Sequence, residues 1–395
     1  MPAGDHAARF EFATAQRIIF GAGTSAELPA ITASFGGKVL IVTGGDAGRH
    51  AGLIGKIRAA VEAVEVYTVS AEPTVDLAEL GARRARALGC DVVIALGGGS
   101  AIDAGKAIAA LAANPGPALD YLEVVGRGQP LPNASLPFLA VPTTAGTGAE
   151  VTRNAVLAVP AARVKVSLRS AHMLPRLALV DPALAVDLPA ATTAATGMDA
   201  LTQLIEPFLS CRATPFVDAL CRDGIPRVAR ALPRAVREPR DLQARGELAL
   251  GALYSGMALA NAGLGAVHGF AAPIGGQFPA PHGAVCAALL PHVLEANLTA
   301  LRTRGPGHPS LAKFDELAVL LTGRTDATAA DAVAVCGDFA QTLAIPSLAR
   351  WGVTRDAIAD LVAKAAVASS MKANPIPLTH DELVDILEAA LASAA

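Results

Sequence analysis

Short apolar runs rich in β-branched residues alternate with stretches of helical periodicity through the first half of the chain. Continuous apolar runs are typical of strands that are buried on both faces of a parallel sheet. In the segments between them, apolar residues recur every three or four positions, which predicts helices. The predicted strands are Arg17–Phe20, Lys38–Thr43, Glu65–Val69, Asp91–Leu96, Pro137–Val141, Asn154–Val159, Val164–Leu168 and Leu177–Asp181, and the predicted helices are 25–34, 49–63, 75–89 and 101–113.

The strand signal nearly ends after Asp181, and the pattern from Pro189 onward is helical. This change predicts two domains, an α/β domain over residues 1–186 and an all-helical domain over 187–395. The last predicted helix opens with a capping box at Thr379–Glu382. Helices are predicted over 190–210, 214–235, 240–262, 264–275, 284–298, 311–322, 326–344, 355–368 and 380–394.

Composition narrows the class of protein. A chain of 395 residues with 52% hydrophobic residues can build two cores without disulfides. A net charge of −3 gives no basic excess for nucleic acid or an anionic membrane. No apolar run reaches the roughly 20 residues of a membrane span, and the polar start Met1–Phe10 lacks a signal peptide's apolar region. We therefore expect a soluble cytoplasmic protein.

The five cysteines are odd in number, scattered and without CxxC spacing. This pattern is typical of small buried side chains in a reducing compartment rather than of disulfides or a zinc cage. The cysteines are Cys90, Cys211, Cys221, Cys286 and Cys336.

A glycine-rich motif, Gly97-Gly98-Gly99-Ser100, lies between a predicted buried strand and a predicted helix. Glycines let the backbone approach an anion, and the first N–H groups of a helix have no intrahelical partner. The motif alone also fits a plain strand–helix turn. As a binding motif, it predicts a phosphate cradle.

Two further strand ends carry similar residues. Gly44-Gly45-Asp46 follows the second strand, and the hydroxyl-rich loop Pro142–Thr152 follows the fifth. Ligands of doubly wound sheets bind outside the carboxyl ends of the strands. We therefore expect a dinucleotide-binding, Rossmann-like domain whose strand ends share one nucleotide, although each segment alone could be a turn.

Asp199 and Gln203 are four residues apart in the first helix of the second half, which places them on one helix face. His268 and His282 follow on other predicted helices. One carboxylate and two imidazoles are the minimum for an open divalent-metal site. A single buried histidine is more often a core residue, so the spacing by itself leaves both readings open.

Together these motifs resemble the iron-containing (group III) alcohol dehydrogenase family over nearly the whole chain. The resemblance implies an N-terminal dinucleotide-binding domain, a C-terminal all-helical domain and a site in the cleft between them. It also implies dimers or larger homo-oligomers. The motifs are RIIFGAG at 17–23, GGGSAIDAGK at 97–106, PTTAGTGAEVT at 142–152, GMDAL at 197–201 and PHG at 281–283.

The resemblance implies NAD(P) and a divalent metal, Fe²⁺ or Zn²⁺, as cofactors. Metal ligation is implied for Asp199, Gln203, His268 and His282, of which Asp199, His268 and His282 are the expected catalytic residues. In the family, a carboxylate directly after the second strand often excludes NADP. This chain has Gly44-Gly45 at that place, which favours use of both NAD and NADP. The implied cofactor residues are Gly44, Asp46, Gly97, Gly98, Gly99, Ser100, Asp103, Thr143, Thr144, Thr147, Asn154 and Lys165.

The chain departs from the family pattern in its second half. Gln203 stands where histidine is usual, and Ala272 replaces a histidine that lines the pocket. A neutral amide oxygen is a poor partner for Fe²⁺ or Zn²⁺ beside imidazole. Pro207, four residues after Gln203, removes a helix hydrogen bond and should kink the helix. These differences predict a weakened metal site.

The resemblance implies hydride transfer between NAD(P) and a small alcohol, aldehyde or ketone. A maleylacetate reductase is an alternative, although those enzymes tend to carry a tyrosine-containing version of the 142–152 loop. A dehydroquinate-synthase-like cyclase shares the distant fold, but its basic substrate-binding residues have no evident counterpart. A catalytically silent dinucleotide-binding protein is a third alternative.

Overall fold

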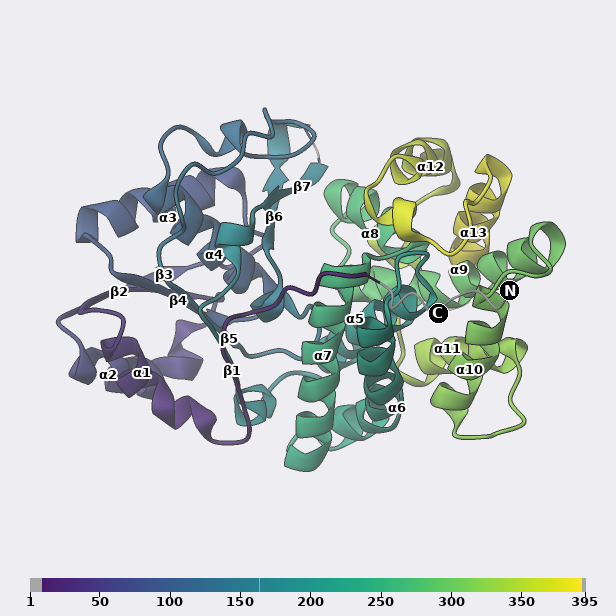
Figure 1. The fold of residues 1–395 in the computed structure, drawn as a ribbon, viewed down its shortest axis with the longest axis horizontal. Helices are drawn as coiled ribbons and strands as arrows, with labels where there is room; N and C mark the ends of the chain where they lie inside the picture. The colour runs from purple at the N-terminus through teal and green to yellow at the C-terminus, as the bar shows by residue number, and fades with distance from the viewer. Residues whose placement is uncertain (1–8, 163, 393–395) are drawn as a thin grey trace, which may run out of the picture.

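The computed structural model describes residues 9–162 and 164–392. A sheet with helices on both sides forms the N-terminal half, and a bundle of helices beside it forms the C-terminal half (Figure 1). The predicted fold class is confirmed. The ends of the expected ranges, residues 1–8 and 393–395, lie outside the described residues, and the division into domains at residues 186 and 187 stays a prediction.

The main sheet has six parallel strands in the order β1-β8-β5-β4-β2-β3. Every residue of the central strand β4 is buried, as its continuous apolar run predicted. Thr43 pairs with Leu96, and Gly97 pairs with Pro142, so β2, β4 and β5 end level with one another. The strands are β1 (Ile18–Phe20), β2 (Lys38–Thr43), β3 (Ala63–Thr68), β4 (Val92–Gly97), β5 (Phe138–Pro142) and β8 (Leu177–Val180).

The two remaining strands lie outside this sheet. β6 (Asn154–Val159) and β7 (Val164–Arg169) form an antiparallel pair of their own. Only four residues separate them in the sequence, and a parallel crossover needs a dozen residues or more. The expectation of a largely parallel sheet therefore holds for six strands and not for this pair.

Helices cover both faces of the main sheet. Leu40 and Val42 of β2 pack with the helices α3 and α4, whereas Val39 and Ile41 pack with α1 and α2. The predicted helix 49–63 is shorter than expected, because Ala63 already begins β3. These helices are α1 (Leu28–Ala33), α2 (Ala51–Ala60), α3 (Val75–Leu88) and α4 (Gly99–Ala113).

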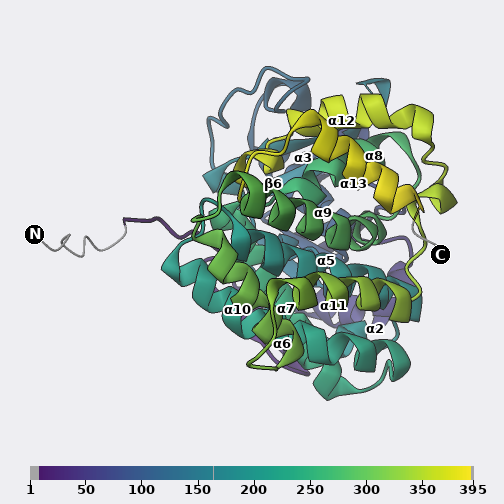
Figure 2. The same ribbon diagram turned by 90° about the vertical axis from the view of Figure 1, so that its right-hand side faces the viewer.

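In the helical half, α9 lies in the middle of the bundle and contacts α5, α8, α11 and α13 (Figure 2). By length and composition, α9 could cross a membrane, but most of it is buried among these helices. The helices are α5 (Ala190–Leu209), α6 (Pro215–Arg237), α7 (Leu242–Ala262), α8 (Ala266–Gln277), α9 (His282–Arg304), α10 (Ser310–Thr322), α11 (Ala329–Thr342), α12 (Ile358–Ala366) and α13 (His380–Ala392).

The structure bears on two sequence-based expectations, one about Pro207 and one about the cysteines. Pro207 lies in the last turn of α5, which continues only to Leu209. It therefore acts near the end of the helix, and Asp199 and Gln203 share an uninterrupted segment. The interpretation of all five cysteines as buried was wrong for Cys211, which is exposed.

Candidate active site at the junction of the two halves

The three polar strand ends meet at one edge of the sheet. Gly98 is the N-cap of α4, and the helix begins at Gly99. A Cβ on Gly97 would lie 3.2 Å from the backbone nitrogen of Gly44, and a Cβ on Gly99 would lie 2.7 Å from Cγ2 of Thr147. These glycines therefore allow the strand ends and the 142–152 loop to pack closely.

Two threonines of the 142–152 loop lie against the same turn. The buried Thr143 donates its backbone N–H to the carbonyl of Gly97 at 3.0 Å. A Cβ on Gly98 would lie 3.3 Å from Cγ2 of Thr144. Ser100 occupies the first turn of α4, where N–H groups lack intrahelical partners. This arrangement is suited to holding a phosphate.

Three other expected cofactor residues have contacts within the protein. Asp103 Oδ2 accepts the backbone N–H of Val156 at 3.1 Å, and the carbonyl of Asn154 accepts a hydrogen bond from buried Lys106 at 2.6 Å. These contacts tie the β6–β7 pair to α4. Lys165 Nζ lies 3.3 Å from Glu72, and close enough to α8 that a Cβ on Gly275 would be 3.2 Å away.

Asp46 lies at the rim of this edge. Its side chain is 69% exposed and lies 3.5 Å from Arg49. Gly44 has open space where a Cβ would project.

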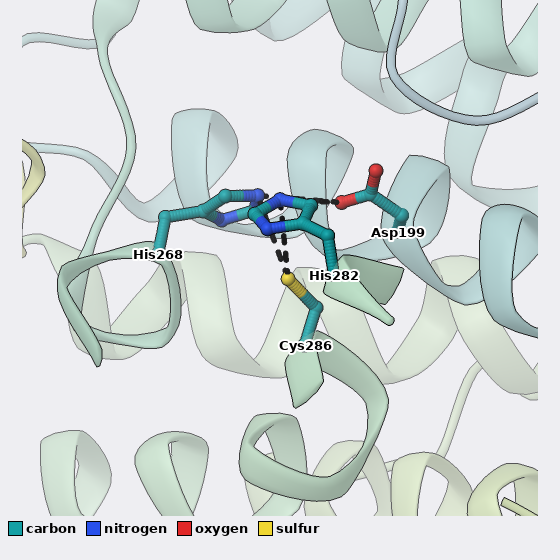
Figure 3. A group of neighbouring side chains, drawn as sticks. All are labelled: Asp199, His268, His282 and Cys286. Carbon is teal, nitrogen blue, oxygen red and sulfur yellow. Dashed lines mark hydrogen bonds and ion pairs between the residues drawn. The ribbon is translucent and has the colours of Figure 1, made fainter. Parts of the chain in front are cut away.

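A second group of polar side chains gathers in the helical half. Asp199 comes from α5, His268 from α8, and His282 and Cys286 from α9 (Figure 3). Asp199 Oδ1 lies 3.3 Å from Nε2 of His268 and 3.7 Å from Nε2 of His282. Asp199, His268 and Cys286 are buried, whereas the side chain of His282 is 36% exposed, so the group is open on the side of His282.

The donor set fits a divalent cation. Metal–oxygen and metal–nitrogen bonds of about 2.0–2.2 Å at tetrahedral angles place neighbouring ligand atoms about 3.3–3.6 Å apart. The observed separations from Asp199 to the two imidazoles are near this range. Asp199 Oδ1 is also buried without a hydrogen-bond partner within the described structure. A buried unpartnered carboxylate oxygen is costly unless a cation meets it.

Glu206 fixes the orientation of His268. Its Oε2 lies 2.6 Å from Nδ1 of His268, and its Oε1 accepts the backbone N–H of Val267 at 2.7 Å. A carboxylate on Nδ1 holds the proton there and leaves Nε2 free to act as a ligand. Glu206 was not predicted from the sequence, although it lies on α5 close to Asp199 and Gln203.

The charges of the group depend on one another. Burial lowers the pKa of His268, but Cys286 and Glu206 outweigh it, so this pKa lies well above its ordinary value. Cys286 is also the largest cause of the raised pKa of His282, about 9, which Asp199 raises as well. Burial raises the pKa of Cys286, but the two imidazoles bring it below its ordinary value. The site therefore favours anionic carboxylate and sulfur beside cationic groups.

The amide of Gln203 has a partner outside this group. Gln203 is buried, and its Oε1 accepts a hydrogen bond from Ser255 Oγ at 3.0 Å. Sequence reasoning named Gln203 and missed Cys286, which it treated as a buried hydrophobic side chain. The signal was present: Cys286 follows His282 by four residues, which places both on one face of α9.

The two groups of residues are joined through the 142–152 loop. A Cβ on Gly146 would lie 2.7 Å from Cβ of Thr196 on α5, three residues before Asp199. A Cβ on Gly148 would lie 2.3 Å from Cα of Gly256 on α7. The loop that lines the glycine-rich turn thus packs directly on the helix that carries Asp199.

Comparison with known families agrees with this geometry. The model of the iron-containing alcohol dehydrogenases matches residues 15–182, and that of the Fe-containing alcohol dehydrogenase family, C-terminal, matches residues 193–391. The chain belongs to the iron-containing alcohol dehydrogenase family. The predicted resemblance is confirmed. This family consists of oxidoreductases that use NAD(P) and a divalent metal, so the chain is an NAD(P)-dependent enzyme of the alcohol dehydrogenase type.

Individual relatives of this iron-containing alcohol dehydrogenase extend over most of its length. It is 36% identical to alcohol dehydrogenase 4 of Schizosaccharomyces pombe over 94% of this chain and 87% of the yeast protein. It is 35% identical to 4-hydroxybutyrate dehydrogenase of Cupriavidus necator over 77% of this chain and 78% of the relative.

A similar solved structure is that of a 1,3-propanediol oxidoreductase, with a TM-score of 0.88 and 32% identity over 97% of this chain and 100% of the other. The sulfoacetaldehyde reductase of Bifidobacterium kashiwanohense, solved with NAD⁺, has a TM-score of 0.84 and 28% identity, covering 98% and 100%.

Proposed function

We propose that this enzyme transfers a hydride between NAD(P) and a small alcohol, aldehyde or ketone where the 142–152 loop meets α5. The observation that carries the proposal is the contact between Gly146 and Thr196. It brings the loop that lines the glycine-rich turn within one helical turn of Asp199. Hydride transfer needs a cofactor and a substrate oxygen in adjacent positions, and this contact supports such an arrangement.

The residues of the sheet edge would hold the dinucleotide. The N–H groups that open α4, at Gly99 and Ser100, are suited to the pyrophosphate because they are unpaired and carry the positive end of the helix dipole. Thr143, Thr144 and Thr147 would complete the wall of the same site. Lys165, which lies close to α8, adds a positive charge near the junction.

Asp199, His268 and His282 would hold the divalent cation. A cation held there would supply Lewis-acid polarisation of the substrate oxygen, and NAD(P) would supply the hydride chemistry. Glu206 keeps Nε2 of His268 directed at Asp199. The side chain of His282 is partly exposed, and a small substrate would enter the site from this side.

Proton transfer in this enzyme would differ from the usual family pattern. Ala272 on α8 offers no titratable side chain where the resemblance implies a histidine. The proton that accompanies hydride transfer would therefore pass through water, a ribose hydroxyl or another side chain. Relatives named for propanediol and hydroxybutyrate favour a short, polar aliphatic substrate.

An activity screen tests this proposal. Purified enzyme, with and without added Fe²⁺ or Zn²⁺, is mixed with NADH or NADPH and a panel of short aldehydes, ketones and hydroxyaldehydes, and nicotinamide oxidation is followed by absorbance. We expect turnover that His268→Ala abolishes and that Gly98→Asp abolishes through loss of cofactor binding. Tight cofactor binding with no turnover on any substrate or metal would refute the proposal.

A further inference from the structure

We propose that Cys286 is the fourth protein ligand of the metal site, as a thiolate beside Asp199, His268 and His282, and that the site therefore selects Zn²⁺. This inference rests on the proposed function, since it concerns the same site. It departs from the ligand set implied by the family resemblance, in which the fourth position here is Gln203.

The first support is geometric. Cys286 Sγ lies 3.7 Å from Nε2 of His268 and 3.7 Å from Nε2 of His282. The four candidate ligand atoms all lie within 4.8 Å of one another. For zinc–sulfur bonds of about 2.3 Å and zinc–nitrogen bonds of about 2.0 Å, a tetrahedral site requires about 3.5 Å between sulfur and nitrogen. Small side-chain shifts suffice to bring this set around one ion, which would accept the substrate oxygen by expanding to five ligands.

The second support is the unpartnered oxygen in the same place. Within the described part of the chain, Asp199 Oδ1 is buried and makes no hydrogen bond, yet it lies 3.3 Å and 3.7 Å from Nε2 of the two imidazoles (Figure 3). A buried carboxylate oxygen that makes no hydrogen bond is suited to meeting a cation at this point. Cys286 is buried and contacts the same two imidazoles.

The third support is the difference between Cys286 and other cysteines of the chain. The sulfur of Cys90 donates to the backbone carbonyl of Val92 at 3.0 Å, and that of Cys211 lies 3.6 Å from the carbonyl of Lys372. Cys286 instead faces the two imidazole nitrogens that the metal site would use.

The fourth support is the environment of Gln203. Its amide oxygen accepts a hydrogen bond from Ser255, whose hydroxyl also lies 2.8 Å from the carbonyl of Ala252. To act as a ligand, the amide would have to share or leave this buried contact, and it would contribute no charge. The thiolate of Cys286 needs no such change.

The proposed set has a chemical consequence. Asp199 and Cys286 together supply two negative charges, which match a divalent cation in a buried site, whereas a set with one carboxylate leaves a net positive charge. Thiolate combined with imidazole favours Zn²⁺ over ions that prefer oxygen ligands. We therefore expect the purified enzyme to retain zinc when both metals are offered.

Cobalt substitution tests the thiolate directly. The metal-free enzyme is titrated with Co²⁺, and the near-ultraviolet region is examined for a sulfur-to-cobalt charge-transfer band, with metal content measured in parallel. We expect one Co²⁺ per chain and a band that Cys286→Ser removes. Cys211→Ser, at the exposed cysteine, and Cys336→Ser, at a buried cysteine in another helix, serve as matched controls that keep the band.

Zinc affinity gives a second readout, measured by competition with a chromophoric chelator. Even the loss of an outer hydrogen-bond partner weakens metal binding by about 10- to 100-fold, so Cys286→Ala should weaken Zn²⁺ binding at least tenfold. Melting curves of the metal-free variants show whether each one folds. If Cys286→Ser does not fold, the sulfur-to-cobalt band of the wild-type enzyme decides whether a thiolate binds the metal.

The outcomes separate this inference from the proposed function. If Co²⁺ binds at a site that His268→Ala destroys, but gives no thiolate band, Cys286 is not a ligand, and hydride transfer can stand. The same conclusion follows if Cys286→Ala keeps the wild-type zinc affinity. If the wild type binds no metal at all, the ligand set is refuted, and turnover in the aldehyde panel then shows whether the proposed activity survives without metal.

Discussion

Oε2 of Glu206 lies 2.6 Å from Nδ1 of His268, and both side chains are buried. The contact fixes which nitrogen of His268 carries the proton, because a carboxylate accepts and cannot donate when ionised. The opposite nitrogen, Nε2, lies 3.3 Å from Asp199 and would offer its lone pair to a bound cation once its own proton is displaced. Glu206 thereby holds the orientation of an imidazole that we propose as a metal ligand.

We predict that Glu206→Gln weakens metal binding by about 10- to 100-fold while the enzyme stays folded. The amide of the variant side chain can still accept one hydrogen bond. It carries no negative charge, however, and therefore no longer stabilises the proton on Nδ1 of His268. Chelator competition for Zn²⁺ measures the effect. Glu295→Gln, an exposed glutamate on α9, is the control that should leave the affinity unchanged. Equal affinity in Glu206→Gln and wild type would show that the contact has no role in ligation.

We predict that Gly98→Asp abolishes dinucleotide binding. Gly98 has φ −77° and ψ −172°, which any residue adopts, so the backbone tolerates the change. The new carboxylate would occupy the space and repel the charge of the pyrophosphate at the start of α4. Fluorescence titration with NADH measures the loss, with Gly52→Asp on the exposed face of α2 as control. Unchanged NADH affinity would place the pyrophosphate elsewhere.

We predict that the enzyme uses both NADH and NADPH, with less than a hundredfold difference in kcat/KM, or about 2.7 kcal/mol. Gly44 leaves open space after β2, and Asp46 lies beside Arg49 at 3.5 Å, which offsets part of its charge. Asp46→Ala should raise kcat/KM for NADPH, and Arg49→Ala should lower it. A stronger preference for NADH in the wild type would mean that Asp46 alone repels the 2′-phosphate.

We predict that Gly256→Ala destabilises the protein by about 1–3 kcal/mol or more, since it overpacks the junction of the two halves. A Cβ at position 256 would lie 2.3 Å from the carbonyl oxygen of Gly148. Gly148 has a φ of +59°, and its backbone cannot easily move away. Gly246→Ala is the matched control on the same helix, because no atom lies within 4 Å of its Cβ. It should stabilise α7 by up to about 1 kcal/mol. Urea unfolding compares the two variants, and equal midpoints would contradict the prediction.

Much of the fold followed from the apolar pattern. Lys38–Thr43 and Asn154–Val159 were predicted with the observed bounds, because in each case polar or turn residues end a clear apolar run. The pattern could not assign β6 and β7 to a separate antiparallel pair. Pairing partners depend on contacts distant in sequence, and periodicity reports only local burial.

The candidate site was predictable only in part. Asp199, His268 and His282 were named from the family pattern, and the structure brings their side chains together. Cys286 was missed because a cysteine on an apolar helix has the composition of a core residue, and its chemistry depends on histidines from two helices. Asp103 was expected at the cofactor, and its contact with the N–H of Val156 was not visible in the sequence. Roles of single residues in cofactor and metal binding stay predictions.

We predict that Gln203→His tightens metal binding and restores the binding that Cys286→Ala removes. Gln203 and Asp199 lie four residues apart on α5, before Pro207 affects the helix, so an imidazole at position 203 shares a helix face with Asp199. Ser255, now 3.0 Å from the Gln203 amide oxygen, would remain as a partner that orients the new ring.

Zinc affinity is measured in Gln203→His, in Cys286→Ala and in the double variant. We expect the double variant to recover at least tenfold in affinity over Cys286→Ala, because an imidazole replaces the lost thiolate as a ligand. Gln203→Leu in the same background is the control, since it removes the amide without adding a donor atom. A double variant that binds no better than this control would show that an imidazole at position 203 does not reach the ion.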